Sequence, residues 1–503
     1  MPQHLLTRLK KIFWPIEKNE LGFFIPMAMM MMCALYNFAA LRSIKDSLVV
    51  SNIGAESISF LKLWLVLPCA IIFTIIYLKL SNIVSLEKVF YIVTSGFLLF
   101  FIFFSLWLYP NKDHLHPDPE RIELLVASYP HIKWFLKILA NWTYALMYIF
   151  SELWSVVIIN LMFWQFANHI VNTDTAKRFY PLFGLIGNLG LVIAGNVMVY
   201  FSDIQGVPET FINFAYYTNA IGADISLKLS IFSVIISGVI MLFLMYYLNA
   251  VVIKNKLYGE KDTEDTVTKL SFVQSVKLIF SSKYVGYITI IIVCYGLAIN
   301  VLEGPWKAKI RELYPTQQQY LAFMGNFNIW MGFTCITFMV IGSNILRLFG
   351  WKVAALFTPG MIGITGITFF SFVFYSDFIK NSDNILWFNP LVAAVLAGGL
   401  QNILSKSTKY SLFDSTKEMA YIPLSIELRT KGKAAAEVVG AKFGKSLGAV
   451  IQSSMFTIFP SADFSELTSI LLVIFSIVIF IWIVDVLALS KEYDKIQHDN
   501  NYK

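Results

Sequence analysis

Long apolar stretches alternate with short polar segments along the whole chain. About 20 helical residues at 1.5 Å each match a hydrocarbon core of about 30 Å. The pattern therefore predicts twelve membrane-spanning helices, near residues 23–45, 58–80, 89–109, 134–168, 183–202, 229–252, 284–303, 323–345, 353–375, 388–405, 436–460 and 467–489. The fourth stretch is too long for a straight crossing, so it is either one tilted helix with an extended end or two spans.

Composition supports this interpretation. Of the 503 residues, 57% are hydrophobic and only 14% are charged, whereas a soluble domain carries about 25% charged residues. Soluble, disordered, collagen-like and disulfide-scaffold classes are therefore excluded. We expect an all-α membrane protein whose partners are the lipid bilayer and a solute, not nucleic acid. The net charge of +7 reflects the basic bias of cytoplasmic loops.

A polar segment at 254–283 divides the spans into two groups of six. We therefore predict an N-terminal half (1–253), a cytoplasmic central loop (254–283) and a C-terminal half (284–503). Lys and Arg concentrate in the segments that are inside if both termini are cytoplasmic, as the positive-inside rule requires. Weak similarity between the halves aligns Lys45 with Lys307. Two six-helix repeats around a central path are the major-facilitator plan.

Charged residues occur within or at the ends of the predicted spans. A charge at the bilayer centre costs at least about 2.5–3.5 kcal/mol on insertion scales, so it persists where it faces a cavity or a partner. The candidates are Arg42, Lys45 and Asp46 in the first span, Glu152 in the fourth, Glu303 and Lys307 at the end of the seventh, and Lys442 and Lys445 in the eleventh.

The cations among these residues suggest a site for a polyanion. Arg42 and Lys45 are three residues apart and share a helix face, and Lys442 and Lys445 repeat that spacing. Lys and Arg bind phosphate through charge-assisted hydrogen bonds. We expect these four cations and Lys307 to bind phosphate groups. The carboxylates Glu152, Glu303 and Asp46 would then balance the cations or gate the path.

Structural alternatives stay open for each candidate. Lys45 and Asp46 could form an interfacial pair that reaches the lipid headgroups, and Glu152 could be a structurally paired carboxylate. The other charged candidates could mark helix ends.

Other motifs refine the expectation. Trp154, Trp164 and Trp306 lie close to the intramembrane charges, and any one could either stack on a nucleobase or pack in the interior. Gly440, Gly444 and Gly448 recur every four residues, a spacing that permits close helix packing in lipid. No metal-ligand cluster, activated nucleophile or cofactor fingerprint is visible. We therefore expect no enzyme, no metal and no other cofactor.

Several long motifs are similar to those of a known family. They include "LRSIKDSLVVSNIGAESISFLKLWLVLP", "SELWSVVIINLMFWQFANHI", "YGLAINVLEGPWKAKIRELYP" and "RTKGKAAAEVVGAKFGKSLGAVIQS". Together they resemble the bacterial and plastid ATP/ADP translocase (nucleotide transporter) family, and within it the rickettsial paralogues, over roughly residues 12–495. The resemblance implies a major-facilitator-like fold and obligate exchange of host ATP for bacterial ADP across the inner membrane.

The same resemblance assigns functional residues. Its two critical lysines and two critical glutamates fall on Lys45, Lys445, Glu152 and Glu303. The chain departs from the family's adenylate exchangers at Leu447, where they have Gly, and at Ser155, where they often have Gly. A paralogue that exchanges other nucleotides, such as guanine nucleotides, or a non-transporting membrane protein that keeps the fold, is the alternative.

Overall fold

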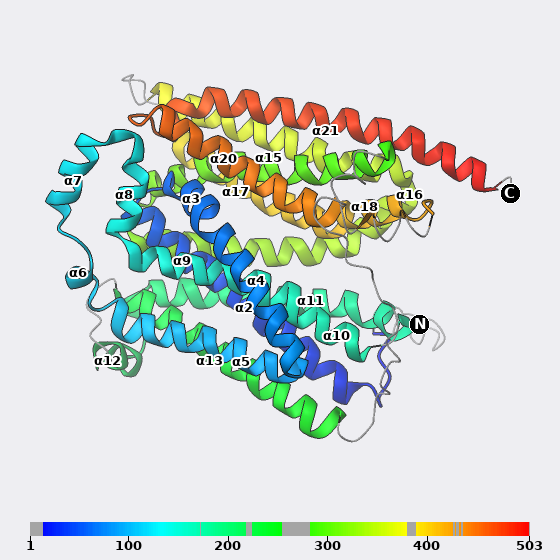
Figure 1. The fold of residues 1–503 in the computed structure, drawn as a ribbon, viewed down its shortest axis with the longest axis horizontal. Helices are drawn as coiled ribbons and strands as arrows, with labels where there is room; N and C mark the ends of the chain where they lie inside the picture. The colour runs from blue at the N-terminus through cyan, green and yellow to red at the C-terminus, as the bar shows by residue number, and fades with distance from the viewer. Residues whose placement is uncertain are drawn as a thin grey trace.

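The computed structural model describes residues 14–171, 173–217, 224–253, 282–379, 389–425, 428, 432–433 and 436–501. Every regular element within these ranges is helical, and ten of these helices are long and apolar enough to cross a membrane. The prediction of an all-helical membrane protein is therefore confirmed. The described chain begins and ends at one end of the molecule, here called the terminal end (Figure 1). The opposite end, which carries two short helices between residues 112 and 128, is called the loop end.

Residues 14–253 are called the N-terminal group. Its helices are α2 (Leu21–Asn52), α3 (Ser57–Phe60), η1 (Leu61–Val66), α4 (Leu67–Ile83), α5 (Leu86–Phe103), η2 (Phe104–Leu108), α6 (Lys112–Leu115), α7 (Pro119–Ser128), η3 (Pro130–Ile132), α8 (Lys133–Ala140), α9 (Trp142–Trp154), η4 (Ser155–Phe163), α10 (Trp164–Ile170), α11 (Thr173–Ser202), η5 (Ile204–Gly206), α12 (Glu209–Tyr217), α13 (Asp224–Tyr247) and η6 (Leu248–Ile253).

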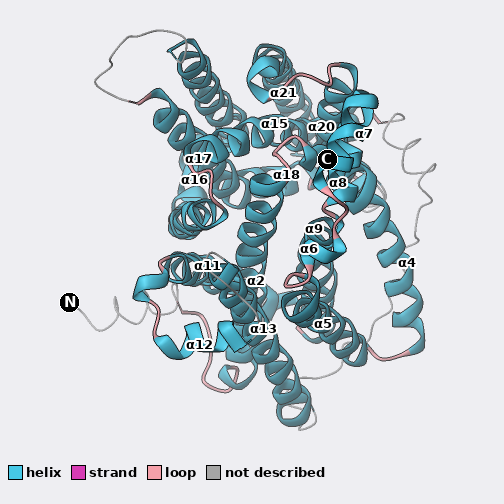
Figure 2. Cartoon of the chain, turned by 90° about the vertical axis from the view of Figure 1, so that its left-hand side faces the viewer, coloured by secondary structure: helices cyan, strands magenta, loops and turns pink. Residues whose placement is uncertain are grey.

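Residues 282–501 are called the C-terminal group. Its helices are α15 (Lys283–Leu313), α16 (Gln317–Ile379), α17 (Pro390–Thr408), η7 (Lys409–Phe413), α18 (Asp414–Tyr421), η9 (Ala436–Gly440), α20 (Ala441–Ile458) and α21 (Phe464–Asn501). Figure 1 shows α15, α17, α20 and α21 on one side of the molecule and α5, α11 and α13 on the other, and Figure 2 shows the same helices end-on.

Several predicted span boundaries can be compared with the structure. The long fourth stretch divides at Asn141, whose backbone leaves the helical region between α8 and α9 (φ −116°, ψ 42°), and a single apolar span then runs over Trp142–Asn168. Helix α16 contains two apolar spans, Gln317–Gly342 and Asn344–Ile379. It is kinked at Gly350, whose positive φ of 77° is easily adopted by glycine.

Two predicted spans are helical but not among the ten apolar helices. Residues 388–405 correspond to α17 and 436–460 to η9 and α20, both of which carry several polar side chains. The count of twelve stays a prediction. The predicted central loop lies almost entirely outside the described residues.

Wide π-helical turns interrupt many of the long helices. They are η1, η2, η4, η6, η7 and η9. A π-helix bonds residue i to i+5. It is found mostly as single turns within α-helices, frequently at functional sites. Here η1 contains Lys62, η7 contains Lys409 and Tyr410, and η4 begins three residues after Glu152. Three of these six wide turns therefore lie beside intramembrane charges.

Glycines allow the helices to approach closely. A Cβ on Gly195 of α11 would lie 2.5 Å from the carbonyl oxygen of Gly325 on α16, so this contact between the two groups requires glycine. Within the C-terminal group, a Cβ on Gly444 would lie 2.7 Å from the carbonyl oxygen of Val293. The predicted close packing around Gly444 is confirmed, and it fixes the position of α20 against α15.

Candidate functional site

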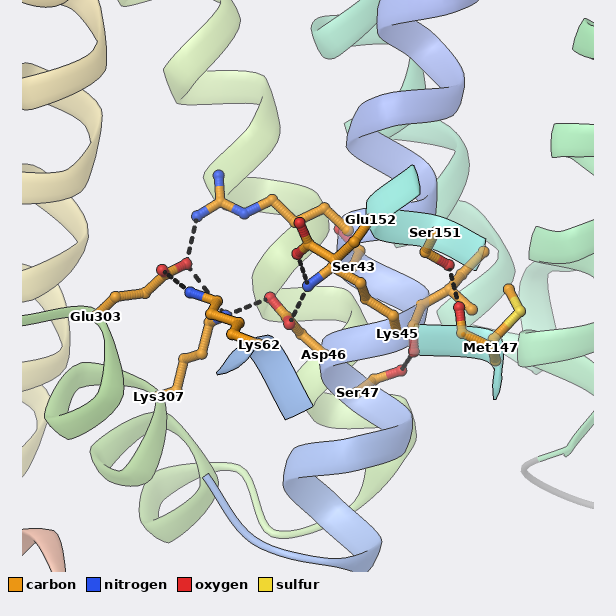
Figure 3. A network of polar contacts seen from close by, with 12 residues as sticks. Ser43, Lys45, Asp46, Ser47, Lys62, Met147, Ser151, Glu152, Glu303 and Lys307 are labelled. Atoms are coloured by element: carbon orange, nitrogen blue, oxygen red, sulfur yellow. Dashed lines mark hydrogen bonds and ion pairs between the residues drawn. The ribbon is translucent and has the colours of Figure 1, made fainter. Parts of the chain in front are cut away.

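Charged side chains from the two helix groups meet in one network, called the ion-pair network below (Figure 3). Helix α2 supplies three residues because its uninterrupted helical run places them on adjacent turns. The members are Arg42, Lys45 and Asp46 on α2, Lys62 on η1, Glu152 on α9, and Glu303 and Lys307 on α15. The structure thus brings together six of the eight residues singled out from the sequence.

Asp46 is the buried centre of the network. The ammonium group of Lys45 lies 2.9 Å from its Oδ1 and that of Lys307 lies 2.9 Å from its Oδ2. The three side chains are at most 5% exposed. A buried charge is tolerated only when it is paired, and here one carboxylate serves a lysine from each helix group.

Glu303 is held by cations from both groups. Its Oε1 lies 3.3 Å from Nη2 of Arg42 and 3.1 Å from the ammonium group of Lys307, one helical turn away. Its Oε2 accepts a hydrogen bond of 2.9 Å from Lys62, which also donates to Oδ1 of Asn300 at 3.2 Å. Glu303 therefore links α15 to both α2 and η1.

Glu152 connects the network to open space. Its Oε1 lies 2.9 Å from the ammonium group of Lys45, which also sits 4.0 Å from the centre of the Tyr148 ring. The Glu152 side chain is 29% exposed, although Lys45 is only 5% exposed. The carboxylate thus lies between a buried lysine and solvent-accessible space.

The network carries more positive than negative charge. Four cations face three carboxylates, which leaves one positive charge unmatched within these seven residues. Among the described residues, Nη1 of the buried Arg42 has no hydrogen-bond partner. An unmatched buried charge and an orphaned donor are both costly, and an incoming anion would relieve both.

Lys445 faces the same space from the other side. Its side chain is exposed, and no ion pair within the described residues involves it. It interacts electrostatically with Glu152, Glu303 and Lys62, so it does not point to the lipid. We call the space onto which Lys445, Glu152 and Lys62 open the central chamber.

The depth of Lys445 follows from helix packing. A Cβ on Gly296 of α15 would lie 3.1 Å from the backbone nitrogen of Lys445. Gly296 precedes Glu303 by seven residues, about 10 Å of helix. Lys445 is therefore about two turns nearer the terminal end than Glu303. The side chain of Lys442, although on α20, lies outside the described residues.

Two chamber residues were missed by the sequence interpretation. Lys62 lies within the predicted span 58–80, so the intramembrane-charge criterion would have found it if it had been applied near the start of a span. Lys409 lies just beyond the predicted span 388–405, because the helix continues through η7 and α18. Lys409 is paired with Asp414 at 2.8 Å and interacts electrostatically with Lys445.

Known proteins share this sequence and fold. A protein-family model described as TLC ATP/ADP transporter matches residues 1–493. The ADP,ATP carrier protein 3 of Rickettsia conorii is 55% identical over 495 residues, which is 98% of each chain. The ADP,ATP carrier protein 1 of Rickettsia bellii is 46% identical over 492 residues, 97% of this chain and 96% of the relative.

The fold is that of major-facilitator-like transporters. The partially occluded, inward-open structure of the xylose transporter XylE from E. coli superposes with a TM-score of 0.55 at 12% identity, covering 94% of this chain and 98% of the other. At that identity the likeness concerns the fold alone. The match over nearly the whole sequence shows the lineage: this protein belongs to the TLC ATP/ADP transporter family.

Proposed function

We propose that the protein is an obligate antiporter that exchanges host ATP for bacterial ADP across the bacterial inner membrane by alternating access. The family and the names of its relatives support the substrate pair. The main observation behind the proposal is that a buried, cation-rich network and an exposed lysine, Lys445, face the same chamber. Phosphate chains are the ligands that such cations recognise.

The proposed architecture has twelve spans in two halves, 1–253 and 284–503, with a cytoplasmic loop at 254–283 and both termini in the cytoplasm. Ten apolar helices, together with α17 and α20, would supply the twelve spans. The alignment of Lys45 with Lys307 supports the duplication, because both lysines bind Asp46, one from α2 and the other from α15. Basic loop residues support the orientation.

In this conformation we infer that the chamber opens toward the terminal end. Several side-chain hydrogen bonds join the groups at the loop end. Arg311 donates to the carbonyl oxygen of Ser51 at 3.3 Å, and Asn52 donates to Gln317 at 3.4 Å. The His131 ring Nδ1 lies 2.8 Å from the carbonyl oxygen of Thr457. With the terminal end cytoplasmic, the state is inward-facing.

The proposed mechanism follows from the cost of buried charge. Electrostatic energies rise steeply as the dielectric constant falls, so an empty chamber with excess positive charge resists closure. A nucleotide whose phosphates lie among Lys445, Lys442 and Arg42 supplies the missing negative charge. Occlusion then becomes favourable, and the equilibrium between states shifts because the substrate binds the occluded state best. The return of the protein to its starting conformation requires a second nucleotide for the same reason, which makes exchange obligatory.

The carboxylates would switch partners during this cycle. Phosphate oxygens would compete with Glu303 for Arg42 and with Glu152 for Lys45. The first of these pairs joins the two helix groups, so binding would loosen that link. Lys307 was also expected to bind phosphate. It is 1% exposed and already bonded to Asp46 and Glu303, so it could reach a nucleotide only after these links open.

Proteoliposomes test the proposal. Uptake of labelled ATP should require internal ADP and should fall to background in Lys45→Ala and Lys445→Ala. Lys283→Ala is the matched control, because this lysine is 72% exposed and pairs with Glu492 far along α21. Unchanged exchange in both chamber variants would refute the phosphate assignment. A panel of adenine, guanine and pyrimidine nucleotides separates ATP/ADP exchange from the alternative of another nucleotide pair.

A further inference from the structure

The π-turn η7 carries an exposed aromatic ring. Tyr410 is 48% exposed, although Ser411, Leu412 and Phe413, which follow it in the same π-turn, are buried. A tyrosine at this depth would normally pack against neighbouring helices. The ammonium group of Lys409, its neighbour in η7, lies 4.8 Å from the centre of the Tyr410 ring, and the ring is still half exposed.

The Tyr410 ring faces the central chamber and not the lipid. Arg42 on α2, Lys409 on η7 and Asp414 on α18 lie close enough to act on the electrostatics of its hydroxyl group. Arg42 belongs to the other helix group and binds Glu303. A side chain pointing outward from the C-terminal group could not approach it.

Tyr410 and Lys445 lie at a similar depth. The neighbouring turn of η7 is fixed by Phe413, whose ring stacks on Tyr295 of α15 at 5.0 Å. Tyr295 immediately precedes Gly296, the residue that contacts the backbone of Lys445. The backbone segments that carry Tyr410 and Lys445 therefore lie near one level of the chamber.

The tryptophans noted in the sequence are placed differently. Trp154 and Trp306 are fully buried, and their indole nitrogens donate to the carbonyl oxygens of Ala34 at 3.4 Å and Val395 at 3.0 Å. Trp164 packs edge-on against Tyr180 at 5.1 Å. All three serve packing in this conformation, whereas the Tyr410 ring is exposed.

We propose that Tyr410 is the platform on which the nucleobase of the transported nucleotide stacks, while the phosphates reach the chamber cations. This inference rests on the proposed nucleotide exchange and adds a subsite to it. Stacking on an aromatic ring tolerates every base because each has a π-face. A purine, with the larger face, gains more than a pyrimidine. The phosphates would thus neutralise the chamber cations, and the ring would recognise the nucleoside.

Kinetics with two ligands separate the two subsites. Proteoliposomes loaded with ADP give the KM for external ATP and the inhibition constant of inorganic tripolyphosphate, which carries phosphates without a base. In Tyr410→Ala the KM for ATP should rise about tenfold, the equivalent of one lost stacking contact. Inhibition by tripolyphosphate should change less than twofold. Tyr410→Phe and Tyr410→Trp should remain close to wild type, because both keep the ring.

Tyr246→Ala is the control for loss of a tyrosine, since Tyr246 is 63% exposed on α13. If Tyr410→Ala does not transport, thermal stabilisation of the purified protein by each ligand replaces the flux measurement. ATP should then stabilise this variant no more than tripolyphosphate does, whereas ATP should stabilise wild type more.

Three results would overturn the proposal: an unchanged KM for ATP in Tyr410→Ala, equal losses for ATP and tripolyphosphate, or a Tyr410→Phe variant as impaired as Tyr410→Ala. Failure of the proposed function looks different, because wild type itself would then show no nucleotide exchange.

Discussion

The ammonium group of Lys307 on α15 lies 2.9 Å from Oδ2 of Asp46 on α2, so the two helix groups are bonded to each other in the protein interior. The other oxygen of Asp46 is held by Lys45. An alternating-access transporter must break contacts of this kind between its helix groups during part of its cycle. We therefore expect the links of the ion-pair network to control both stability and exchange.

Asp46→Asn should destabilise the protein strongly. The change leaves Lys45 and Lys307 close together without their shared carboxylate, and removing one partner of a buried ion pair typically costs about 3–5 kcal/mol. Denaturant unfolding of the purified protein in detergent checks this expectation. The double variant Asp46→Asn/Lys307→Met should recover part of the loss, because it also removes an unpaired ammonium group. A single variant as stable as wild type would contradict the assignment.

Lys62→Gln should impair exchange while leaving the fold intact. Lys62 is 23% exposed at the chamber and holds Oε2 of Glu303, so its loss leaves Glu303 bound more firmly to Arg42 and Lys307. We expect the KM for nucleotide to rise about tenfold, the loss of about 1.4 kcal/mol of binding free energy. Transport kinetics measure this. Lys79→Gln, a change of an exposed lysine on α4, should behave as wild type.

A cross-link at the loop end should stop transport. Asn52 and Gln317 come from different helix groups, and their side chains are hydrogen-bonded. After replacement of the four free cysteines, a short bifunctional thiol reagent should join Asn52→Cys to Gln317→Cys and hold that end closed. Exchange should fall to background and return on reduction if the linker contains a disulfide. Full exchange by cross-linked protein would contradict closure at this end.

Stability should depend on pH through Glu56, which lies between α2 and α3 at the loop end. Burial raises the pKa of this carboxyl above its ordinary value of 4.5, and Asp463 adds to the effect while Arg311 opposes it. The folded protein therefore keeps a proton that the unfolded chain releases, so stability falls as the pH rises above 4.5. Melting temperatures of wild type and Glu56→Gln across this range check the sign, because the variant should lack this contribution.

Much of the architecture could be predicted from the sequence because hydropathy and helix length are local properties. The ten apolar helices fall on predicted spans. Six of the seven network residues were found because a charge in an apolar stretch needs a partner. Their pairing could not be predicted: Asp46 binds Lys45 next to it and Lys307 from a helix 261 residues further along, and that contact depends on tertiary packing.

Tyr410 shows why the rest of the site was missed. The sequence contains many aromatic residues, and composition alone does not distinguish a ring in the chamber from one facing lipid. Tyr410 lies in the wide turn η7, and such a turn depends on helix packing and has no clear sequence signature. Lys409 was missed for a related reason, since the helix that carries it continues beyond the apolar stretch.

The wide turns also affect how these helices tolerate changes in length. Each turn in η1 or η7 holds one residue more than a regular α-helical turn needs. Deleting a single residue inside an ordinary helix rotates all later residues of that helix by about 100° around its axis. Within Leu61–Val66 or Lys409–Phe413 the same deletion would convert a widened turn into a regular one. Related chains can therefore gain or lose a residue in these two segments without rotating the rest of the helix.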